Sequence, residues 1–368
     1  MSPGENPAIL LKAEGLQVRR GGALVLDIPV LDIFPDQILA LIGPNGAGKS
    51  TLLLALACLL KPARGRFSFN GRVIDAGRGD VEYRRRVALV FQEPLLFDAT
   101  VFDNVAAGLK IRGTGREEIV RTVPAYLERF GIAHLARRSA RKLSGGEAQR
   151  TSLARAFVTK PEIVFLDEPF SSLDPPTREA LIGDFEKILR ETRTTAVVAT
   201  HDQTEALRLA DRIAVMNGGR IAQIGPVAEV MNRPADGFVA SFVGVETVLP
   251  GHVLRISDGV FTAAVEGGEI EAVGHVRTGE GILCCIRPEH VTLSTNAPPP
   301  GTSARNVFSG RIRTITPLGL FHRVRLDCGF DLTAYVTRQS FETLSLEEGK
   351  SVIASFKATA VHVIPRQT

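Results

Sequence analysis

The sequence predicts an α/β domain built on a mostly parallel β sheet, followed by a second domain that consists almost entirely of β strands. Three observations lead to this fold class. A glycine-rich loop at 43–51 separates an apolar run from an apolar helical stretch. Short apolar runs then alternate with helical patterns as far as residue 242, and beyond it glycine-separated short strands replace the helices. We therefore expect domains at 1–242 and 243–368.

The elements of the first domain follow from local patterns. Its strands should be the short apolar runs 9–11, 24–30, 38–42, 67–69, 86–91, 163–166 and 196–200, followed by a hairpin at 212–225. Turns are expected at Arg20-Gly21-Gly22, Asn70-Gly71 and Asn217-Gly218. Helices are expected at 52–60, 117–130, 144–158 and 178–190. Residues 93–150 should form a helical insert, in which Pro124 must lie near the start of its helix or kink it.

The second domain repeats itself. Gly251-His-Val and Gly310-Arg-Ile open its two parts, and IRPEHV at 286–291 corresponds to FKATAV at 356–361. A proline-rich stretch at 296–301 separates the two parts. This pattern predicts two small related β-barrel units, the second at about 302–364.

Composition limits the kinds of protein to which the chain can belong. Its 368 residues are 44% hydrophobic and 23% charged, which is typical of globular domains and excludes disorder. The net charge of +4 is mild and scattered, so we expect no nucleic-acid partner. The longest apolar stretch, 52–60, has about half the ~20 residues that span a bilayer. With no signal sequence at the N-terminus, we expect a soluble chain or one that a partner holds at a membrane.

The cysteines Cys58, Cys284, Cys285 and Cys328 lack the spacing of a zinc site. Cys58 lies inside the apolar helix that follows the glycine loop. We therefore expect buried reduced thiols rather than a metal site or a disulfide framework.

The loop GPNGAGKST at 43–51 has the spacing of a nucleotide phosphate cradle. Its fixed positions are Gly43, Gly48, Lys49 and Ser50, and the loop is completed by Pro44, Asn45, Gly46, Ala47 and Thr51. Glycines allow successive backbone N–H groups to surround a polyphosphate, and the next helix adds its positive N-terminal end. Lys49 should contact the β- and γ-phosphates, and the Ser50 hydroxyl should bind Mg²⁺. The alternative is a glycine-rich turn with a chance lysine.

Two further motifs carry groups that suit the same chemistry. Asp167 and Glu168 end an apolar strand, so that Asp167 can bind Mg²⁺ through water and Glu168 can polarise an attacking water. A solvated turn is the alternative for such a pair. Ser144, Gly145 and Gly146 begin a helix and offer hydroxyl and N–H donors to an anion, unless Ser144 is simply a helix cap.

Six motifs occur in a fixed order along the first domain: GPNGAGKST at 43–51, Gln92, LSGGEAQR at 143–150, FLDEP at 165–169, SSLD at 171–174 and THD at 200–202. Through these motifs residues 8–242 resemble the ATP-binding cassette (ABC) family. The resemblance implies a P-loop NTPase fold with an antiparallel β subdomain and a helical subdomain. It also implies ATP and Mg²⁺ as cofactors, and two copies of the chain that close head to tail around ATP.

Within that resemblance the motif residues have expected roles. Gln92 would sense Mg²⁺ and the γ-phosphate, and His201 would support the γ-phosphate and the attacking water. Residues 144–146 would hold the ATP of the opposite copy, and Asp174 would communicate across the dimer. The family usually stacks adenine on an aromatic residue where this sequence has Arg20, and a guanidinium plane can stack on a base too.

Residues 302–364 resemble the small oxyanion-binding barrel of molybdate and tungstate proteins (TOBE/Mop type). The similarity lies in SARN at 303–306, GRI at 310–312, VTRQSFETLSLEEG at 336–349 and ASFKATAVHV at 354–363. It implies an OB-like barrel in which Ser303, the backbone N–H groups near Arg305 and the Lys357 ammonium surround a tetrahedral dianion. The alternative is a structural barrel that helps two tails dimerise. Ala358 stands where some relatives have a serine ligand.

The whole chain thus resembles the ATPase subunit of a molybdate or tungstate importer. The resemblance implies a peripheral position on the cytoplasmic face of the membrane, permease subunits docked near Gln92 and the helical insert, and an extracytoplasmic binding protein. We further expect oxyanion bound between paired tails to slow ATP hydrolysis. Two alternatives stay open: an importer of sugar, sulfate, iron or polyamine, and a soluble ABC protein that acts on nucleic acid or ribosomes.

Overall fold

The computed structural model describes residues 8–75, 80–296 and 302–366. The chain divides into two compact units between Val227 and Ala228, and each unit is described by itself. The sequence placed this division between 242 and 243, so two short helices before that point, α8 (Val227–Asn232) and α9 (Gly237–Phe242), belong mainly to the second unit.

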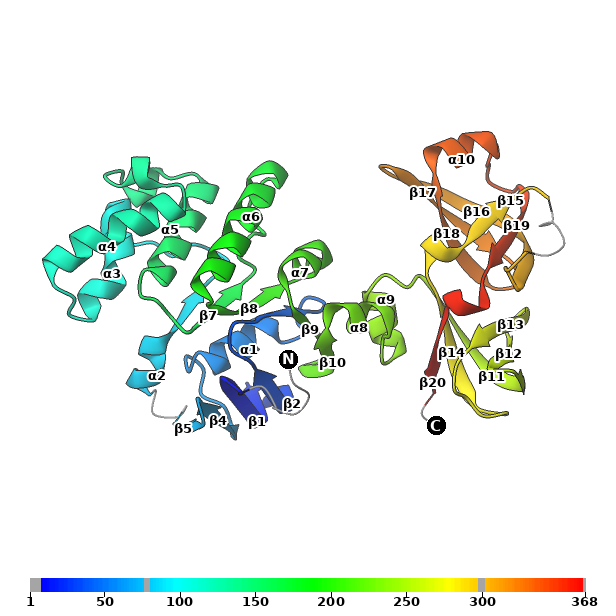
Figure 1. Ribbon diagram of the computed structural model, residues 1–368, viewed down its shortest axis with the longest axis horizontal. Coiled ribbons are helices and arrows are strands. Elements are labelled where there is room, and N and C mark those ends of the chain that lie inside the picture. The colour runs from blue at the N-terminus through cyan, green and yellow to red at the C-terminus, as the bar shows by residue number, and fades with distance from the viewer. Residues whose placement is uncertain (1–7, 76–79, 297–301, 367–368) are drawn as a thin grey trace. The chain divides into compact units, whose positions relative to one another are not determined.

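A six-stranded sheet forms the centre of the first unit (Figure 1), with the strand order β10-β9-β3-β8-β7-β6. Its parallel strands are β3 (Ile38–Ile42), β6 (Val87–Val90), β7 (Ile163–Asp167), β8 (Thr195–Thr200) and β9 (Arg212–Asn217), and β10 (Arg220–Pro226) is antiparallel to β9.

Both faces of this sheet are buried. Phe165 and Val197 pack in a core with helix α1 (Lys49–Leu56), whereas Val164 and Val198 join a second core on the opposite face. Neighbouring residues of one strand therefore enter different cores, which explains why these strands read as continuous apolar runs. The prediction of a mostly parallel sheet covered on both faces is confirmed.

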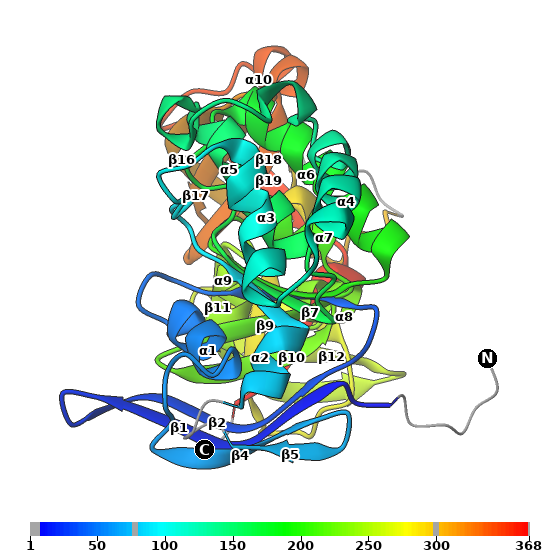
Figure 2. The same cartoon turned by 90° about the vertical axis from the view of Figure 1, so that its left-hand side faces the viewer.

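The other helices of the first unit are α2 (Val81–Arg86), α3 (Val101–Ile111), α4 (Arg116–Arg129), α5 (Gly145–Phe157), α6 (Pro175–Thr192) and α7 (Gln203–Leu209). Helices α3, α4 and α5 form the predicted helical insert and lie at the end of the unit opposite to a four-stranded antiparallel sheet (Figure 2). Pro124 lies inside α4 rather than near its start, so of the two predicted alternatives only a kink at this position stays open. The carbonyl that loses its partner belongs to Val120, a solvent-exposed position where water can replace the bond.

The four-stranded sheet has the order β2-β1-β4-β5. Its strands are β1 (Leu11–Arg20), β2 (Ala23–Ile33), β4 (Arg64–Phe69) and β5 (Arg72–Ile74). The first strand is much longer than the predicted 9–11. The sequence did not reveal its full length, because only every second side chain is buried and the pairing shifts after Glu14. The turns at Gly21-Gly22 and Asn70-Gly71 are confirmed, and all four residues have the positive φ that such hairpins need.

The second unit contains two five-stranded antiparallel sheets, with the orders β13-β12-β11-β14-β20 and β15-β19-β16-β17-β18. The first four-strand set is β11 (Thr247–Ser257), β12 (Val260–Val265), β13 (Gly268–Val273) and β14 (Gly281–Ile286), followed by β15 (Thr292–Ser294). The second is β16 (Asn306–Leu318), β17 (Phe321–Asp327), β18 (Asp331–Thr337) and β19 (Ser351–Phe356), followed by β20 (Val361–Pro365). The short helix α10 (Arg338–Thr343) lies between β18 and β19.

The predicted repeat is present, but the two halves are not separate barrels. Each half gives its last strand to the sheet of the other half, because β15 pairs with β19 and β20 pairs with β14. The strand pairings shift at equivalent points, after Val253 in one half and after Ile312 in the other. One hydrophobic core contains residues from both halves, so neither half buries its apolar side chains alone. Of the predicted proline-rich stretch, residues 297–301 lie outside the described residues.

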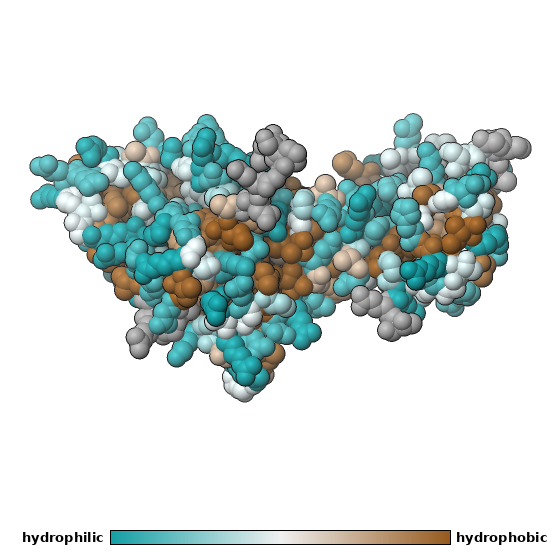
Figure 3. Space-filling model, turned by 60° about the horizontal axis from the view of Figure 1, so that its bottom comes forward, coloured by the Kyte–Doolittle hydropathy of each residue, from teal (hydrophilic) through white to brown (hydrophobic). Residues whose placement is uncertain are grey.

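The four cysteines are buried free thiols, as predicted. Burial raises the pKa of Cys58 and Cys328 to about 11 and that of Cys284 and Cys285 to about 12. Such thiols stay protonated at neutral pH and are poor nucleophiles. No helix in the described part of the chain combines the length and apolar character needed to cross a membrane. Hydrophilic side chains cover much of the face shown in Figure 3, with hydrophobic ones in groups between them, as on most globular proteins.

The β9–β10 hairpin turns at Gly218-Gly219 rather than at the predicted Asn217-Gly218, because Asn217 is still paired with Arg220. Both glycines have positive φ, but their surroundings differ. A Cβ atom at Gly219 would lie 2.3 Å from the Val25 carbonyl oxygen, whereas at Gly218 it would meet nothing within 4 Å. Gly219 is therefore required both by its positive φ and by its close approach to Val25, whereas Gly218 is required by its positive φ alone.

We expect Gly218→Ala to lower the free energy of unfolding by about 1–2 kcal/mol, the cost of a left-handed alanine. Gly219→Ala should cost at least about 2 kcal/mol more, since the backbone of β2 must also move. Thermal and urea unfolding of the two matched variants measures the difference. Equal losses of unfolding free energy in the two variants would show that the close approach to Val25 does not affect stability.

Candidate functional site

The loop between β3 and α1 has a backbone that only glycine can adopt at several positions. Gly43, Gly46 and Gly48 have φ values of 154°, 81° and 101°. A Cβ atom at Gly43 would lie 2.3 Å from the Met216 carbonyl oxygen, and one at Gly48 would lie 2.7 Å from a methyl carbon of Leu26. The glycines thus permit both the turn and its close packing against β2 and β9.

Lys49 begins α1 and is only 6% exposed. Its ammonium donates hydrogen bonds to the carbonyl oxygens of Gly43 (2.7 Å) and Pro44 (3.2 Å), within the loop itself. Burial lowers the pKa of Lys49, and the carboxylates of Glu168 and Asp167 partly oppose this shift. A buried cation of this kind is well placed to bind an anion beside the loop.

Ser50 and Asp167 meet at the end of the central sheet. The Ser50 hydroxyl donates a 2.9 Å hydrogen bond to Oδ1 of Asp167, the last residue of β7. Burial raises the pKa of Asp167, and the hydrogen bond from Ser50 opposes the shift. A hydroxyl and a carboxylate side by side are the hard oxygen donors that Mg²⁺ prefers, so these residues fit the predicted metal.

Glu168 lies at the point where Gln92 and His201 converge. Its carboxylate oxygen Oε2 is 3.1 Å from Nδ1 of His201 and accepts a 3.5 Å hydrogen bond from Nε2 of Gln92. Its φ is 45°, a strained value for a non-glycine residue, and its N–H donates to the Ala199 carbonyl at 2.8 Å. The hydrogen bond to Ala199 thus fixes the strained backbone of Glu168, and in this conformation its carboxylate contacts His201 and Gln92.

A cavity of about 260 Å³ opens beside these groups. It is lined by Arg20, Val25, the loop residues 45–51 and Glu168, so the β1–β2 hairpin and the end of β7 contribute to one site. The predicted residues Gly43 and Pro44 belong to the loop but are not among the lining residues.

A second cavity, of about 440 Å³, gathers Ser144, Gly145, Gly146 and Asp174. Ser144 caps α5, because its N–H donates to Glu147 (2.7 Å) and its Oγ accepts from the Glu147 N–H (3.3 Å). The alternative prediction of a helix cap is therefore confirmed, and the exposed start of α5 still faces this cavity. The lining residues of the two cavities do not overlap within the described part of the chain.

Sequence reasoning missed residues that line these cavities and one that contacts Gln92 and Glu168. Val25 comes from β2, Thr177 from the start of α6, and the Ser171 hydroxyl accepts a hydrogen bond from Gln92 at 3.2 Å while donating to the Glu168 carbonyl at 3.1 Å. Ser171 lies in the SSLD motif, so its place in the sequence was a usable signal. Val25 has no such signal in the sequence, because only the fold of the β1–β2 hairpin brings it next to the glycine loop.

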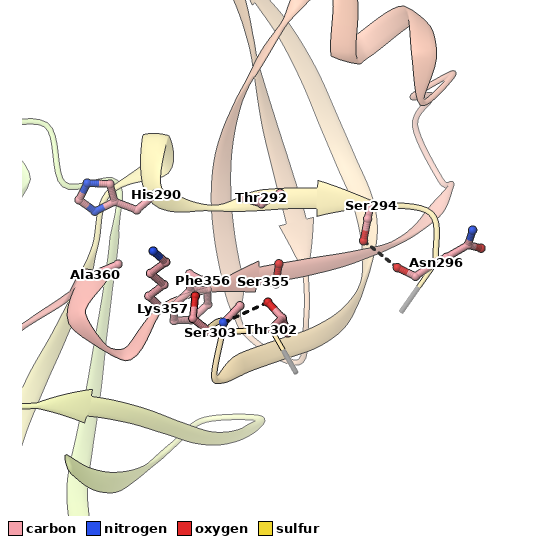
Figure 4. A pocket seen from close by; sticks show the side chains of 11 residues that line it. His290, Thr292, Ser294, Asn296, Thr302, Ser303, Ser355, Phe356, Lys357 and Ala360 are labelled. Atoms are coloured by element: carbon pink, nitrogen blue, oxygen red, sulfur yellow. Dashed lines mark hydrogen bonds between the residues drawn. The ribbon is translucent and has the colours of Figure 1, made fainter. Parts of the chain in front are cut away.

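The second unit has a cavity of about 670 Å³, shown in Figure 4. Ser303 and Lys357 line it, as predicted for an oxyanion site, and so does Ala304 next to Arg305, although Arg305 itself does not. The cavity also has hydroxyl and imidazole groups that the sequence did not suggest: His290, Thr292, Ser294, Thr302 and Ser355. Strands β15 and β19 supply most of them, so the exchange of last strands builds this cavity.

The repeat places Arg287 where the other half has Lys357, yet the two positions have different surroundings. Arg287 donates hydrogen bonds to the carbonyls of Met231 and Val243, the latter at 3.2 Å. Next to it, Nε2 of His362 lies 3.0 Å from the Pro234 carbonyl. The segment with α8 and α9 therefore fills the position next to Arg287, whereas Lys357 lines an open cavity.

Comparisons with known proteins agree with this geometry. Residues 26–171 match the family described as ABC transporter, and residues 302–363 match the TOBE domain. The molybdate/tungstate import ATP-binding protein WtpC of Pyrococcus horikoshii is 39% identical over 340 residues, which cover 91% of this chain and 94% of that protein. The chain belongs to the ABC transporter family. The predicted fold class, an ABC ATPase domain followed by a TOBE domain, is confirmed.

Other relatives of this ABC protein have names with different cargoes. The Fe(3+) ions import ATP-binding protein FbpC of Streptomyces coelicolor is 43% identical over 67% of this chain and 70% of that protein. The spermidine/putrescine import ATP-binding protein PotA of Acidothermus cellulolyticus is 37% identical over 86% of this chain and 83% of that protein. The solved structure of cbiO1 from Clostridium perfringens, part of an ABC transporter complex, has a TM-score of 0.57 and 31% identity, covering 65% of this chain and 96% of that one.

We expect Lys49→Met to keep the length and much of the packing of the side chain but to weaken nucleotide binding about 10- to 100-fold, because charge-assisted bonds to phosphate are lost. Titration of the full chain with a fluorescent ATP analogue measures this loss. Lys187→Met, at an exposed position of α6, is the matched control and should bind the analogue like the parent chain. Unchanged affinity of the Lys49 variant would contradict the assignment of the loop.

Proposed function

We propose that this chain is the ATP-hydrolysing subunit of an importer for molybdate or tungstate. The observation that carries the ATPase part of this proposal is the convergence of Gln92 and His201 on the carboxylate of Glu168, beside a phosphate loop and the Ser50–Asp167 pair. This arrangement provides a base, an anion-binding loop and two oxygen ligands in one place, which is what phosphoryl transfer to water requires.

In the proposed site ATP lies along the cavity beside the loop, with its phosphates on the loop N–H groups and Lys49. Mg²⁺ would be held by Ser50, Asp167 and Gln92, and when bound it would neutralise charge on the β- and γ-phosphates. Gln92 uses its Nε2 in both of its hydrogen bonds, so its carbonyl oxygen is the atom that would reach the metal. Arg20 lines the cavity, and its guanidinium would stack on the base.

Glu168 is the group we assign as the general base. It would take a proton from the attacking water, while His201 orients the carboxylate and supports the γ-phosphate. The strained backbone of Glu168 supports this role, because strain of this kind tends to occur where a side chain must point in one direction.

Two copies of the chain would complete two such sites. The phosphate loop and the start of α5 line different cavities of one chain, which supports a nucleotide held between the loop of one copy and the α5 start of the other. Residues 144–146 of each copy would then face the γ-phosphate bound by the other, with Asp174 beside them. This is the head-to-tail dimer that the motif order implies.

The permease is the second proposed partner. Leu95 and Phe97 follow Gln92 and are 60% and 56% exposed. Arg155 lies over the Phe97 ring at 5.6 Å and donates to the Leu95 carbonyl at 2.8 Å, which fixes this apolar pair at the edge of the helical insert. Membrane subunits would dock here, so the chain would lie on the cytoplasmic face of the membrane, and an extracytoplasmic protein would deliver the anion.

Cargo and regulation are assigned through the second unit. The relatives with molybdate/tungstate names match most of the chain, including the TOBE domain. The Lys357 cavity has an ammonium and several hydroxyls, which suit a tetrahedral dianion. Its counterpart at Arg287 already binds carbonyl oxygens, which supports the idea that this position of the repeat recognises oxygen acceptors. Oxyanion bound between paired tails would slow ATP hydrolysis.

We expect Glu168→Gln to retain ATP while turnover falls by about 10²- to 10⁴-fold, the usual contribution of a general base. Retained ATP and phosphate release are measured on the same purified full chain. Glu179→Gln, on the surface of α6, should hydrolyse ATP normally. Normal turnover in the Glu168 variant would remove this residue from the base role.

We expect the full chain to bind molybdate and tungstate in calorimetry, and Lys357→Met to weaken that binding about 10- to 100-fold. Arg305→Met should bind as the parent chain does, because that side chain does not line the cavity. Heat only with iron or polyamine would instead favour the other cargoes named among the relatives, and equal binding of sulfate would favour a sulfate importer. In the assembled transporter, an ATPase rate that millimolar molybdate leaves unchanged would contradict the regulatory role.

A further inference from the structure

Arg178, in the first turns of α6, touches two loops that carry different motifs. Its Nη2 donates to the carbonyl of Leu173 at 3.4 Å, directly before Asp174. Its Nη1 donates to the Asp202 carboxylate at 3.5 Å, directly after His201. One guanidinium therefore lies between the loop that ends in Asp174 and the loop that contains His201.

The loop around His201 is held by its two neighbours. The Thr200 hydroxyl accepts from the N–H of Asp202 (3.0 Å) and donates to Oε2 of Glu205 (2.6 Å). Oδ1 of Asp202 caps α7 by accepting from the N–H groups of Thr204 (2.8 Å) and Glu205 (3.3 Å). The Asp202 carboxylate is therefore tied to the backbone that follows the imidazole, and the Asp202 N–H to the residue that precedes it.

Glu205 places a carboxylate in the interior behind this loop, where it is only 4% exposed. Burial raises its pKa, and the hydrogen bond from Thr200 and the charge of Arg178 oppose that shift. Burying a carboxylate is costly unless partners compensate, and the nearest cation is Nε of Arg178 at 3.9 Å. That Nε atom is buried and makes no hydrogen bond within the described residues, so the guanidinium is attracted to Glu205 without being locked to it.

We infer that Arg178 is a positioning residue that couples the Asp174 loop to His201, with Glu205 as its buried counter-charge. The inference rests on the proposed function, because it assigns Arg178 to the same ATPase site. The contacts of 3.4–3.9 Å are long enough to shorten or break when the Asp174 loop moves. Movement of that loop then changes the position of Asp202, and with it the 3.1 Å approach of His201 to Glu168. Partner closure at Asp174 is thus transmitted to the residue that orients the base.

The test compares Arg178→Met with Arg178→Lys in the full chain. Arg208→Met is the matched control, because Arg208 also joins α7 to α6, through Glu179 and Glu186, but on the surface away from both loops. We expect Arg178→Met to lower kcat at least tenfold, with affinity for a fluorescent ATP analogue within twofold of the parent value. Arg178→Lys should recover part of kcat, and Arg208→Met should keep both values.

The same substitution is then made in a His201→Ala background. If Arg178 acts through His201, Arg178→Met causes little further loss there, whereas a merely structural role lowers turnover by the same factor in both backgrounds. Equal losses, or an unchanged kcat, would overturn the inference. If Arg178→Met does not fold, Arg178→Lys replaces it in both backgrounds. We then expect a smaller loss of kcat, which is again absent when His201 is replaced by alanine. A parent chain that hydrolyses no ATP would defeat the proposed function instead.

Discussion

Everything in the first unit depends on one constraint, the parallel pairing of strands whose two faces are both buried. Strands β3, β6, β7 and β8 all end at the same edge of the sheet. The phosphate loop, Gln92, Glu168 and His201 come after these strands, and Asp167 is the last residue of β7. Polar groups that are far apart in the sequence therefore meet where the apolar strands end, which is where α/β proteins commonly bind ligands.

A different constraint shapes the second unit. The exchange of last strands means that neither half can complete its sheet alone. The exchange also creates two equivalent positions, next to Arg287 and Lys357, which the chain uses differently. One position holds the backbone carbonyls of residues 231 and 243 and so fixes the entry into the unit. The other lines an open cavity and is available for a ligand with oxygen acceptors.

The success of sequence reasoning varied with how local each signal is. Runs such as 163–166 were identified almost to the residue, because burial on both faces leaves no polar interruption. The long strand β1 was mostly missed, since only one of its faces is apolar and its pairing shifts. Pro124 inside α4 shows that tertiary packing can override the propensity of a single residue. Val25 and Thr177 carried no local mark of their place beside the cavities.

The sequence by itself determined the phosphate loop, the order of the motifs, the reduced thiols and the repeat in the tail. These features depend on spacing within short segments, and local backbone geometry translates such spacing directly into structure. Only the tertiary structure decided that Arg305 does not line the cavity beside Lys357, that the halves of the tail exchange strands, and that Arg178 joins two loops. Those contacts join residues whose distance in space is set by strand order and pairing, and no short segment contains that information.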